Sequence, residues 1–449
     1  MPTEDVGFFN PIAFGITLLM GLLLLFLPRR YALVPVILHV CTIPMFPSLM
    51  IGGLHFRMLR ILVIFGLARI VVRGEVRALK LNQIDKAFAW WALSAAVMHA
   101  LLWRESREIL WCVGNVGDEL GFYFLFRCLV RELDDVVRAF KIIAILAVPV
   151  ALAMVFEGVT LKNPFVAFGA EGKIPEIRHV LARARGAFAN PILAGSYGGA
   201  ILPFFFALWP ESRLLALLGI FSSSVITVAS GASGPLMTYG ASILGLCMWV
   251  FRKKMRAIRW GIVLMLVGLE CVMKAHVWWI IGHIEIIPGS GAYHRAVLID
   301  QAIRHFPEWF LVGTKDTEAW GYYLHDITNQ FVWEGVQGGL LQLILFVTII
   351  VLCFRAVGRT LPAMQNQPFA QRFCVWALGA ALFSDVITFF GVPYYDQNFV
   401  KWNLLLAMIS SVSTSFVSTK GKTWARVTPF RDDTESPCPV PVAAEHQRV

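Results

Sequence analysis

The chain has 449 residues, of which 57% are hydrophobic and only 15% are charged. This balance leaves too little polar surface for a soluble globular protein and predicts one that crosses a membrane several times. The formal charge of +10 is typical of loops that face anionic lipid, and we predict no nucleic-acid partner. The eight cysteines show no CxxC spacing, so neither a disulfide framework nor a zinc site is predicted.

The apolar residues form continuous blocks of roughly 17–25 residues, the length that a helix needs to cross a bilayer. Because only helices or closed barrels satisfy their own backbone in lipid, we expect an all-α polytopic membrane protein with about 12–13 transmembrane helices. The predicted spans are 11–27, 31–51, 57–72, 86–102, 108–127, 138–156, 191–209, 213–230, 234–251, 260–281, 326–354, 372–392 and 398–417.

The basic residues gather in every second connection, which places the N-terminus outside and the C-terminus inside. Residues 1–427 then form a single helical domain, and the proline-rich tail 428–449 is predicted to be disordered in the cytoplasm. The two longest interruptions, 157–190 and 281–325, both lie on the outer side. They carry basic residues, which are unusual in translocated loops and indicate an anionic ligand there.

In the first long loop, Pro175 and Glu176 favour the start of a short helix over 175–185, followed by apolar residues at helical spacing. Arg178 and Arg185 would share one face of it, close to Arg183. Two guanidinium groups on one face suit a diphosphate, because each can bind phosphate oxygens bidentately. The alternative is a helix on lipid headgroups with its basic side in water.

In the second long loop, an amphipathic helix is predicted over 292–306, with Arg295 near its start. Arg295 is either a surface residue or a phosphate ligand. His325 stands where the loop re-enters the membrane, followed by Asp326 and Asn329. Its imidazole could take a proton from an attacking hydroxyl, or it is simply a histidine at headgroup level. The aromatic residues of this loop form an interfacial belt or stack on sugars; they include Trp320, Tyr322 and Tyr323.

Charged residues inside spans must pair or face a cavity, and we expect Arg69 to pair with Asp118 or Glu119. The first outer loop, 52–57, contains no acidic residue. Paired carboxylates for a metal are therefore missing there, and we predict no metal and no cofactor.

Several segments together resemble the O-antigen ligase and O-antigen polymerase superfamily of bacterial envelope glycosyltransferases. They are Arg-Ala-Arg-Gly-Ala-Phe-Ala-Asn-Pro (183–191), Ser-Gly-Ala-Ser-Gly-Pro (230–235), Arg295 after Gly-Ser-Gly, Leu-Val-Gly-Thr (311–314), and the run 325–339. The resemblance implies a GT-C-like fold in the bacterial inner membrane. It also implies a periplasmic active site that takes a glycan from undecaprenyl diphosphate without a metal.

Carried over by residue, the resemblance makes Arg183 or Arg185, with Arg295, the diphosphate ligands. It makes His325 the catalytic base or the group that orients the acceptor. Arg178 joins the diphosphate-binding arginines, and Arg295 also acts in catalysis. We expect acceptor or sugar contacts from Trp320, Tyr322, Tyr323, Asp326 and Asn329. The first function expected is polymerisation of lipid-linked repeat units for an exopolysaccharide or O-antigen. The alternatives are a ligase acting on lipid A–core or protein, and a lipid-linked glycan transporter. The expected partners are the lipid-linked glycan, the acceptor, membrane lipids and components of a polysaccharide export system.

Overall fold

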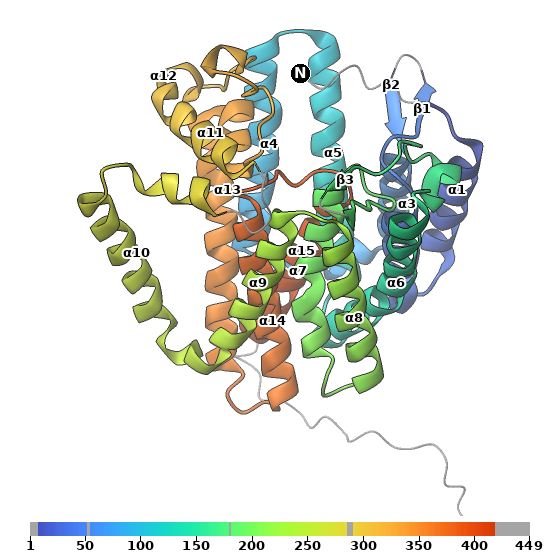
Figure 1. Ribbon diagram of the computed structural model, residues 1–449. Coiled ribbons are helices and arrows are strands. Elements are labelled where there is room, and N and C mark those ends of the chain that lie inside the picture. The colour runs from blue at the N-terminus through green and yellow to red at the C-terminus, as the bar shows by residue number, and fades with distance from the viewer. Residues whose placement is uncertain (1–7, 52–53, 179–180, 285–290, 418–449) are drawn as a thin grey trace, which may run out of the picture.

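The computed structural model describes residues 8–51, 54–178, 181–284 and 291–417. Nearly all of this chain is helical (Figure 1). The helices are α1 (Pro11–Phe26), α2 (Leu33–Thr42), α3 (Met58–Val72), α4 (Gln83–Trp103), α5 (Ser106–Leu129), α6 (Leu133–Thr160), α7 (Pro191–Ala207), α8 (Arg213–Ala229), α9 (Ser233–Cys247), α10 (Met255–Val272), α11 (Ala292–Arg304), α12 (Phe306–Trp309), α13 (Gln330–Ala363), α14 (Phe369–Thr388) and α15 (Gln397–Val417). The short 3-10 turns are η1 (Arg29–Tyr31), η2 (Glu75–Ala78), η3 (Pro164–Phe168), η4 (Met248–Lys254), η5 (Val277–His283) and η6 (Glu318–Trp320).

The all-helical prediction is confirmed, and each of the thirteen predicted apolar segments contains a helix. Within the described residues, three helices are long and apolar enough to cross a membrane, namely α6, α13 and α14. A fourth crossing results if the segments 233–272 and 277–283, which are bent by 92°, are counted as one span. The second predicted segment holds only the ten-residue α2, because Pro44 and Pro47 cannot donate the backbone hydrogen bonds that would continue it.

Two small antiparallel hairpins complete the described chain. The first joins β1 (Ser48–Ile51) to β2 (Leu54–Arg57), and the second joins β3 (Ile177–Arg178) to β4 (Leu181–Ala182). The predicted helix over 175–185 is therefore wrong. So short a segment gains little from helical spacing alone. Here the hairpin is closed instead by the Arg183 amide, which donates to the Glu176 carbonyl at 2.9 Å.

The two long interruptions lie at the same end of the helical bundle, which we call the loop end (Figure 1). Asn10, before α1, donates from Nδ2 to the carbonyl of Ala167 in the first interruption. Gln397, the first residue of α15, donates to the carbonyl oxygens of Ile43 and Ala187. Asn329, before α13, donates to the Phe390 carbonyl after α14. Helix termini from six places in the chain therefore meet at the loop end.

The opposite end of the bundle carries the basic connections, and we call it the basic end. Arg29 forms an ion pair with Asp135 at 2.7 Å, and Arg131 donates to the Glu75 carbonyl at 3.2 Å. Successive long helices run between the two ends in alternating directions, as the distribution of basic residues predicted.

Helix α10 stands apart from the other long helices at the side of the bundle (Figure 1). None of its described residues is buried, although its sequence is strongly apolar. In a membrane protein such a surface faces lipid. The chain then turns through η5 back toward the bundle, so α10 leads directly into the loop that bears Arg295.

The charged residues of the early helices pair differently from the prediction. Arg69 binds Glu75 at 2.9 Å, whereas Asp118 is bound by Arg60 at 2.8 Å. Glu119 accepts a hydrogen bond of 2.6 Å from Asn403 of α15. The expected pairing of Arg69 with Asp118 or Glu119 is wrong, because Arg69 lies near the basic end, where η2 supplies an acid six residues later.

Candidate functional site

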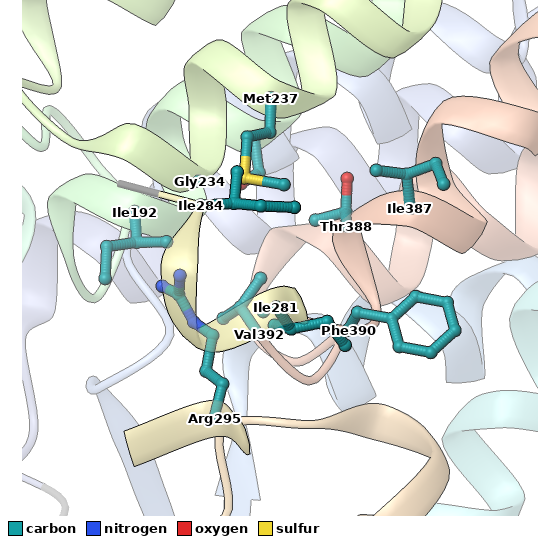
Figure 2. Close-up of a pocket in the computed structure, with 12 residues that line it drawn as sticks. Ile192, Gly234, Met237, Ile281, Ile284, Arg295, Ile387, Thr388, Phe390 and Val392 are labelled. Atoms are coloured by element: carbon teal, nitrogen blue, oxygen red, sulfur yellow. The ribbon is translucent and has the colours of Figure 1, made fainter. Parts of the chain in front are cut away.

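A cavity of about 230 Å³ lies at the loop end, between α7, α9, the end of α14 and the second interruption (Figure 2). Most of its wall is apolar. Ile192 comes from α7, Met237 from α9 and Ile281 from η5, while Phe390 and Val392 follow α14. Among the described residues that line the cavity, Arg295 is the one that carries a charge. A guanidinium group can bind phosphate oxygens bidentately, so this otherwise apolar cavity suits a ligand with an anionic group and an apolar part.

Arg295 reaches the cavity because α11 is amphipathic. The predicted helix over 292–306 is confirmed as α11, and its buried side includes Ala292, Ala296 and Leu298. Arg295 lies on that side and is only 7% exposed. Figure 2 shows its guanidinium group extending from α11 into the cavity.

Two glycines adjoin the Arg295 side chain. A Cβ atom at Gly391 would lie 3.5 Å from its Cζ atom, and one at Gly234 would lie 3.9 Å from Nη2. The guanidinium group therefore lies between the chain that follows α14 and the start of α9.

Two hydroxyl groups add polarity to this wall. Ser196 of α7 lines the cavity, and its buried Oγ has no hydrogen-bond partner among the described residues. Thr388 of α14 also lines it and shares a 2.7 Å hydrogen bond with Thr238 of α9. A buried hydroxyl without a partner costs free energy, so Ser196 is available to bind a ligand atom.

Arg183 approaches the same part of the protein from the other long interruption. It is 8% exposed and forms an ion pair with Glu176. A Cβ atom at Gly231 would lie 3.1 Å from its Cγ atom, whereas Gly234, three residues later, adjoins Arg295. The connection between α8 and α9, residues 230–235, therefore lies between two buried arginines from separate interruptions.

The other two predicted diphosphate ligands are placed differently. Arg185 is bound by Glu171, with an ion pair of 3.1 Å and a 2.7 Å hydrogen bond to the Glu171 carbonyl. Arg178 is the last residue of β3, and its side chain lies outside the described part of the structure. Because β3 and β4 form a hairpin, Arg178 and Arg185 do not share the helical face that their seven-residue spacing predicted.

His325 lies at the loop end with an exposed side chain, and its ring centroid is 5.6 Å from that of Tyr323. It does not line the cavity. The backbone carbonyl of its neighbour Asp326 accepts a hydrogen bond of 3.1 Å from Nε2 of His294, the residue before Arg295. This contact holds the His325 segment against the start of α11. The structure thus brings His325 and Arg295 to adjoining segments, but the His325 side chain is exposed whereas the Arg295 side chain is buried and lines the cavity.

The predicted acceptor contacts separate into exposed and buried residues. Tyr322 and Tyr323 are exposed and pack edge to face at 4.5 Å. Trp320 is buried, donates from Nε1 to Glu308 at 2.8 Å and stacks on His305. Asn329 is buried as the N-cap of α13, where Oδ1 accepts from the amides of Phe331 and Val332. Only the tyrosines and Asp326 therefore present side chains that an acceptor could reach directly.

Two of the segments that carry the resemblance, Leu-Val-Gly-Thr (311–314) and the run 325–339, pack directly on each other. Gly338 and Gly339 interrupt the helical conformation of α13, with a φ of +71° at Gly339. The amide of Thr314 donates to the Val336 carbonyl at 2.9 Å, and a Cβ atom at Gly313 would lie only 2.2 Å from that oxygen. The glycines permit this close backbone approach, so Leu-Val-Gly-Thr and the Gly-Gly pair fix the second interruption onto α13.

Sequence reasoning missed the polar residues between α14 and α15. The hydroxyl oxygen of Tyr395 accepts a hydrogen bond of 2.7 Å from Nδ2 of Asn190. Burial, with the negative charges of Asp396 and Asp326, raises the pKa of Tyr395 to about 12. Asp396 itself is fully buried. The signal in the sequence is the polar run Tyr395-Asp-Gln-Asn between two apolar segments, with no basic residue in it.

No match was found when the chain was compared with protein-family models and with curated proteins. In the part of the chain that the structure describes, no three His, Cys, Asp or Glu side chains gather closely enough to hold a metal ion. Fold and site together define a class: an all-helical membrane protein whose loop end contains a buried arginine in an apolar cavity.

Proposed function

We propose that this protein is a glycosyltransferase that polymerises oligosaccharide repeat units carried on undecaprenyl diphosphate. The single observation that carries the proposal is the placement of Arg295, a buried guanidinium group in an otherwise apolar cavity at the loop end. A lipid diphosphate combines the two properties this cavity selects, an anionic group and an adjoining apolar chain. The sugar chemistry comes from the resemblance of the sequence segments, which all lie at or beside the loop end.

In this proposal the chain forms 12–13 transmembrane spans with a GT-C-like arrangement in the bacterial inner membrane. The loop end faces the periplasm and the basic end faces the cytoplasm, in agreement with the positive-inside rule. Helix α10, exposed along its length, faces the lipid from which the substrate would come.

The transfer step requires an acceptor hydroxyl, a base and a stabilised leaving group. The acceptor oxygen attacks the anomeric carbon of the donor sugar, and the bond from that carbon to the diphosphate oxygen breaks, leaving the electron pair on the diphosphate. Arg295 stabilises this charge, supported by Arg183 behind the 230–235 connection. His325 takes the acceptor proton, and Tyr322, Tyr323 and Asp326 contact the acceptor sugar.

Reconstitution in liposomes with a lipid-linked repeat unit and no other acceptor tests the proposal. We expect a ladder of products that differ by one repeat, together with release of undecaprenyl diphosphate. Transfer that occurs only after lipid A–core is added would replace the polymerase with a ligase. Movement of the lipid across the bilayer without any new glycosidic bond would refute transfer and favour a transporter.

A further inference from the structure

The turn that leads into α7, residues 185–190, is held by two buried carboxyl groups. At its start, Oε2 of Glu157 accepts from the amides of Arg185 at 3.1 Å and Gly186 at 2.7 Å. At its end, Oδ2 of Asp396 accepts from the amide of Ala189 at 2.7 Å. Both acids are fully buried. The turn is therefore fixed through its backbone, from α6 on one side and from the α14–α15 connection on the other.

Asp396 belongs to four consecutive side chains that all bind the start of α7 or the turn before it. Tyr395 binds Asn190 at 2.7 Å, Gln397 binds the Ala187 carbonyl at 2.8 Å, and Asn398 binds the Leu193 carbonyl at 3.0 Å. Asp396 adopts a φ of +58°, a conformation that is uncommon for residues other than glycine. Such strain persists only where surrounding contacts stabilise it.

These contacts join two walls of the Arg295 cavity. Ile192 and Ser196 line it from α7, just after the turn, while Gly391 and Val392 line it from the connection that leads to Asp396. Arg183 precedes the same turn by two residues. A weaker hydrogen bond between Asp396 and the turn would therefore alter the spacing between α7, the end of α14 and the two buried arginines.

We propose that Asp396 is a positioning residue, whose carboxylate binds the turn before α7 and so sets the spacing of the cavity walls that hold the anionic ligand. The identity of that ligand rests on the proposed function, whereas the contact between Asp396 and the turn does not. The side chain acts through the Ala189 amide and does not itself line the cavity.

The stability of the contact between Asp396 and the turn depends on pH, because the Asp396 carboxyl group titrates. Burial raises the pKa of Asp396 to about 7, although the amides of Ala189 and Gln397 and the positive charge of Arg57 act to lower it. The neighbouring titratable groups are Tyr395, Asp326, whose charge acts on Tyr395, and Glu157 at the other end of the turn. The ionised carboxylate accepts charge-assisted hydrogen bonds from the turn, but burial outweighs them, because the pKa lies above that of a solvated aspartate. Opening that hydrates the carboxylate therefore becomes easier as the pH rises, and the turn is held less tightly once the pH has risen to about 7.

The first test measures the turn itself and needs no ligand. Hydrogen exchange over a peptide spanning the turn is compared between the wild type and Asp396→Asn at the same pH, so that intrinsic exchange cancels. Asparagine keeps a neutral acceptor and resembles the protonated acid. We expect exchange in the variant, relative to the wild type, to become at least roughly 5-fold slower between about pH 5.5 and about pH 8.5. Equal exchange at both values overturns the proposal.

The second test measures binding of undecaprenyl diphosphate in lipid nanodiscs. The ligand also titrates near neutral pH, so the informative quantity is the ratio of the variant Kd to the wild-type Kd. For Asp396→Asn this ratio should fall by at least roughly 5-fold between the same two pH values. Asp396→Ala, which has no acceptor, should weaken binding at both.

Glu318→Gln provides the matched control, because it removes one acidic charge from an exposed residue of the second interruption. Its Kd ratio should remain at about 1, as expected for a solvated charge. A pH-independent ratio for Asp396→Asn overturns the positioning role even if the lipid binds. If the wild type binds no lipid while the exchange difference appears, the proposed function fails and the positioning role stands.

Discussion

Replacing Arg295 by alanine tests the ligand cavity most directly. The substitution removes the one charged side chain among the described residues that line the cavity. It leaves the buried face of α11 otherwise intact, because Ala292, Ala296 and Leu298 provide the remaining contacts. Alanine also favours the helix, so α11 should still form.

The expected loss follows from the chemistry of the contact. A hydrogen bond to a charged group contributes about 1.5–3 kcal/mol, and a tenfold change in affinity corresponds to about 1.4 kcal/mol. One phosphate contact from Arg295 therefore predicts that binding of undecaprenyl diphosphate weakens by roughly 10- to 150-fold. Arg295→Lys should give an intermediate loss, because lysine keeps the charge without the planar fork.

Arg304→Ala on the same helix is the matched control. Arg304 is exposed, and its ion pair with Asp300 at 2.7 Å lies within one turn of α11. Asp300 is buried but still accepts from Nε1 of Trp278 at 3.3 Å, and Arg304 does not line the cavity, so this variant should bind the lipid like the wild type. Binding is measured in nanodiscs by titration with the lipid diphosphate. Equal affinities for Arg295→Ala and Arg304→Ala would refute the assignment of the cavity to an anionic headgroup.

Three further results are expected. His325→Ala should reduce glycan transfer by about 10²–10⁴-fold without changing lipid affinity, measured by single-turnover product formation; loss of binding instead would contradict a role as base. Gly339→Ala places a Cβ atom 2.5 Å from a backbone carbonyl oxygen at a φ of +71°. It should destabilise the protein by about 2–3 kcal/mol in thermal unfolding, whereas Gly358→Ala in the same helix meets nothing within 4 Å and should not destabilise it. The pKa of Glu171 lies below its ordinary value. Burial raises this pKa, but the hydrogen bonds from Arg185 and Lys173 together lower it by more. The ion pair with Arg185 should therefore persist at neutral pH and be lost as the pH falls through that depressed pKa, and carboxyl NMR should show a higher value in Arg185→Gln.

The helices could be predicted from the sequence because their signal is continuous. Each apolar block is long enough to cross a bilayer, and a backbone in hydrocarbon has few alternatives to a helix. The helix α11 was also predictable, since the apolar residues of 292–306 recur at helical spacing on a polar background. Arg295, placed beside that apolar stripe, is accordingly buried.

The first long interruption was predicted less well because its contacts are not local. Residues 175–185 have helical spacing, yet Glu176 and Arg183 meet across a hairpin, and Arg185 pairs with Glu171. A spacing of seven residues places two arginines on one face only if the segment is helical. Which acid pairs with which arginine depends on distant segments, so the partners of Arg69 and Asp118 could not be predicted either.

The sequence segments that resemble the glycosyltransferase superfamily share a physical role at the loop end, which is close backbone approach. Residues 311–314 bind the interrupted part of α13, residues 230–235 pass between Arg183 and Arg295, and the turn 185–190 is held by Glu157 and Asp396. Small residues and buried acids bring separate backbone segments together and leave a cavity with a charged wall. The arginines are therefore fixed before any ligand arrives, so the proposed stabilisation of a leaving diphosphate would require little rearrangement of the protein.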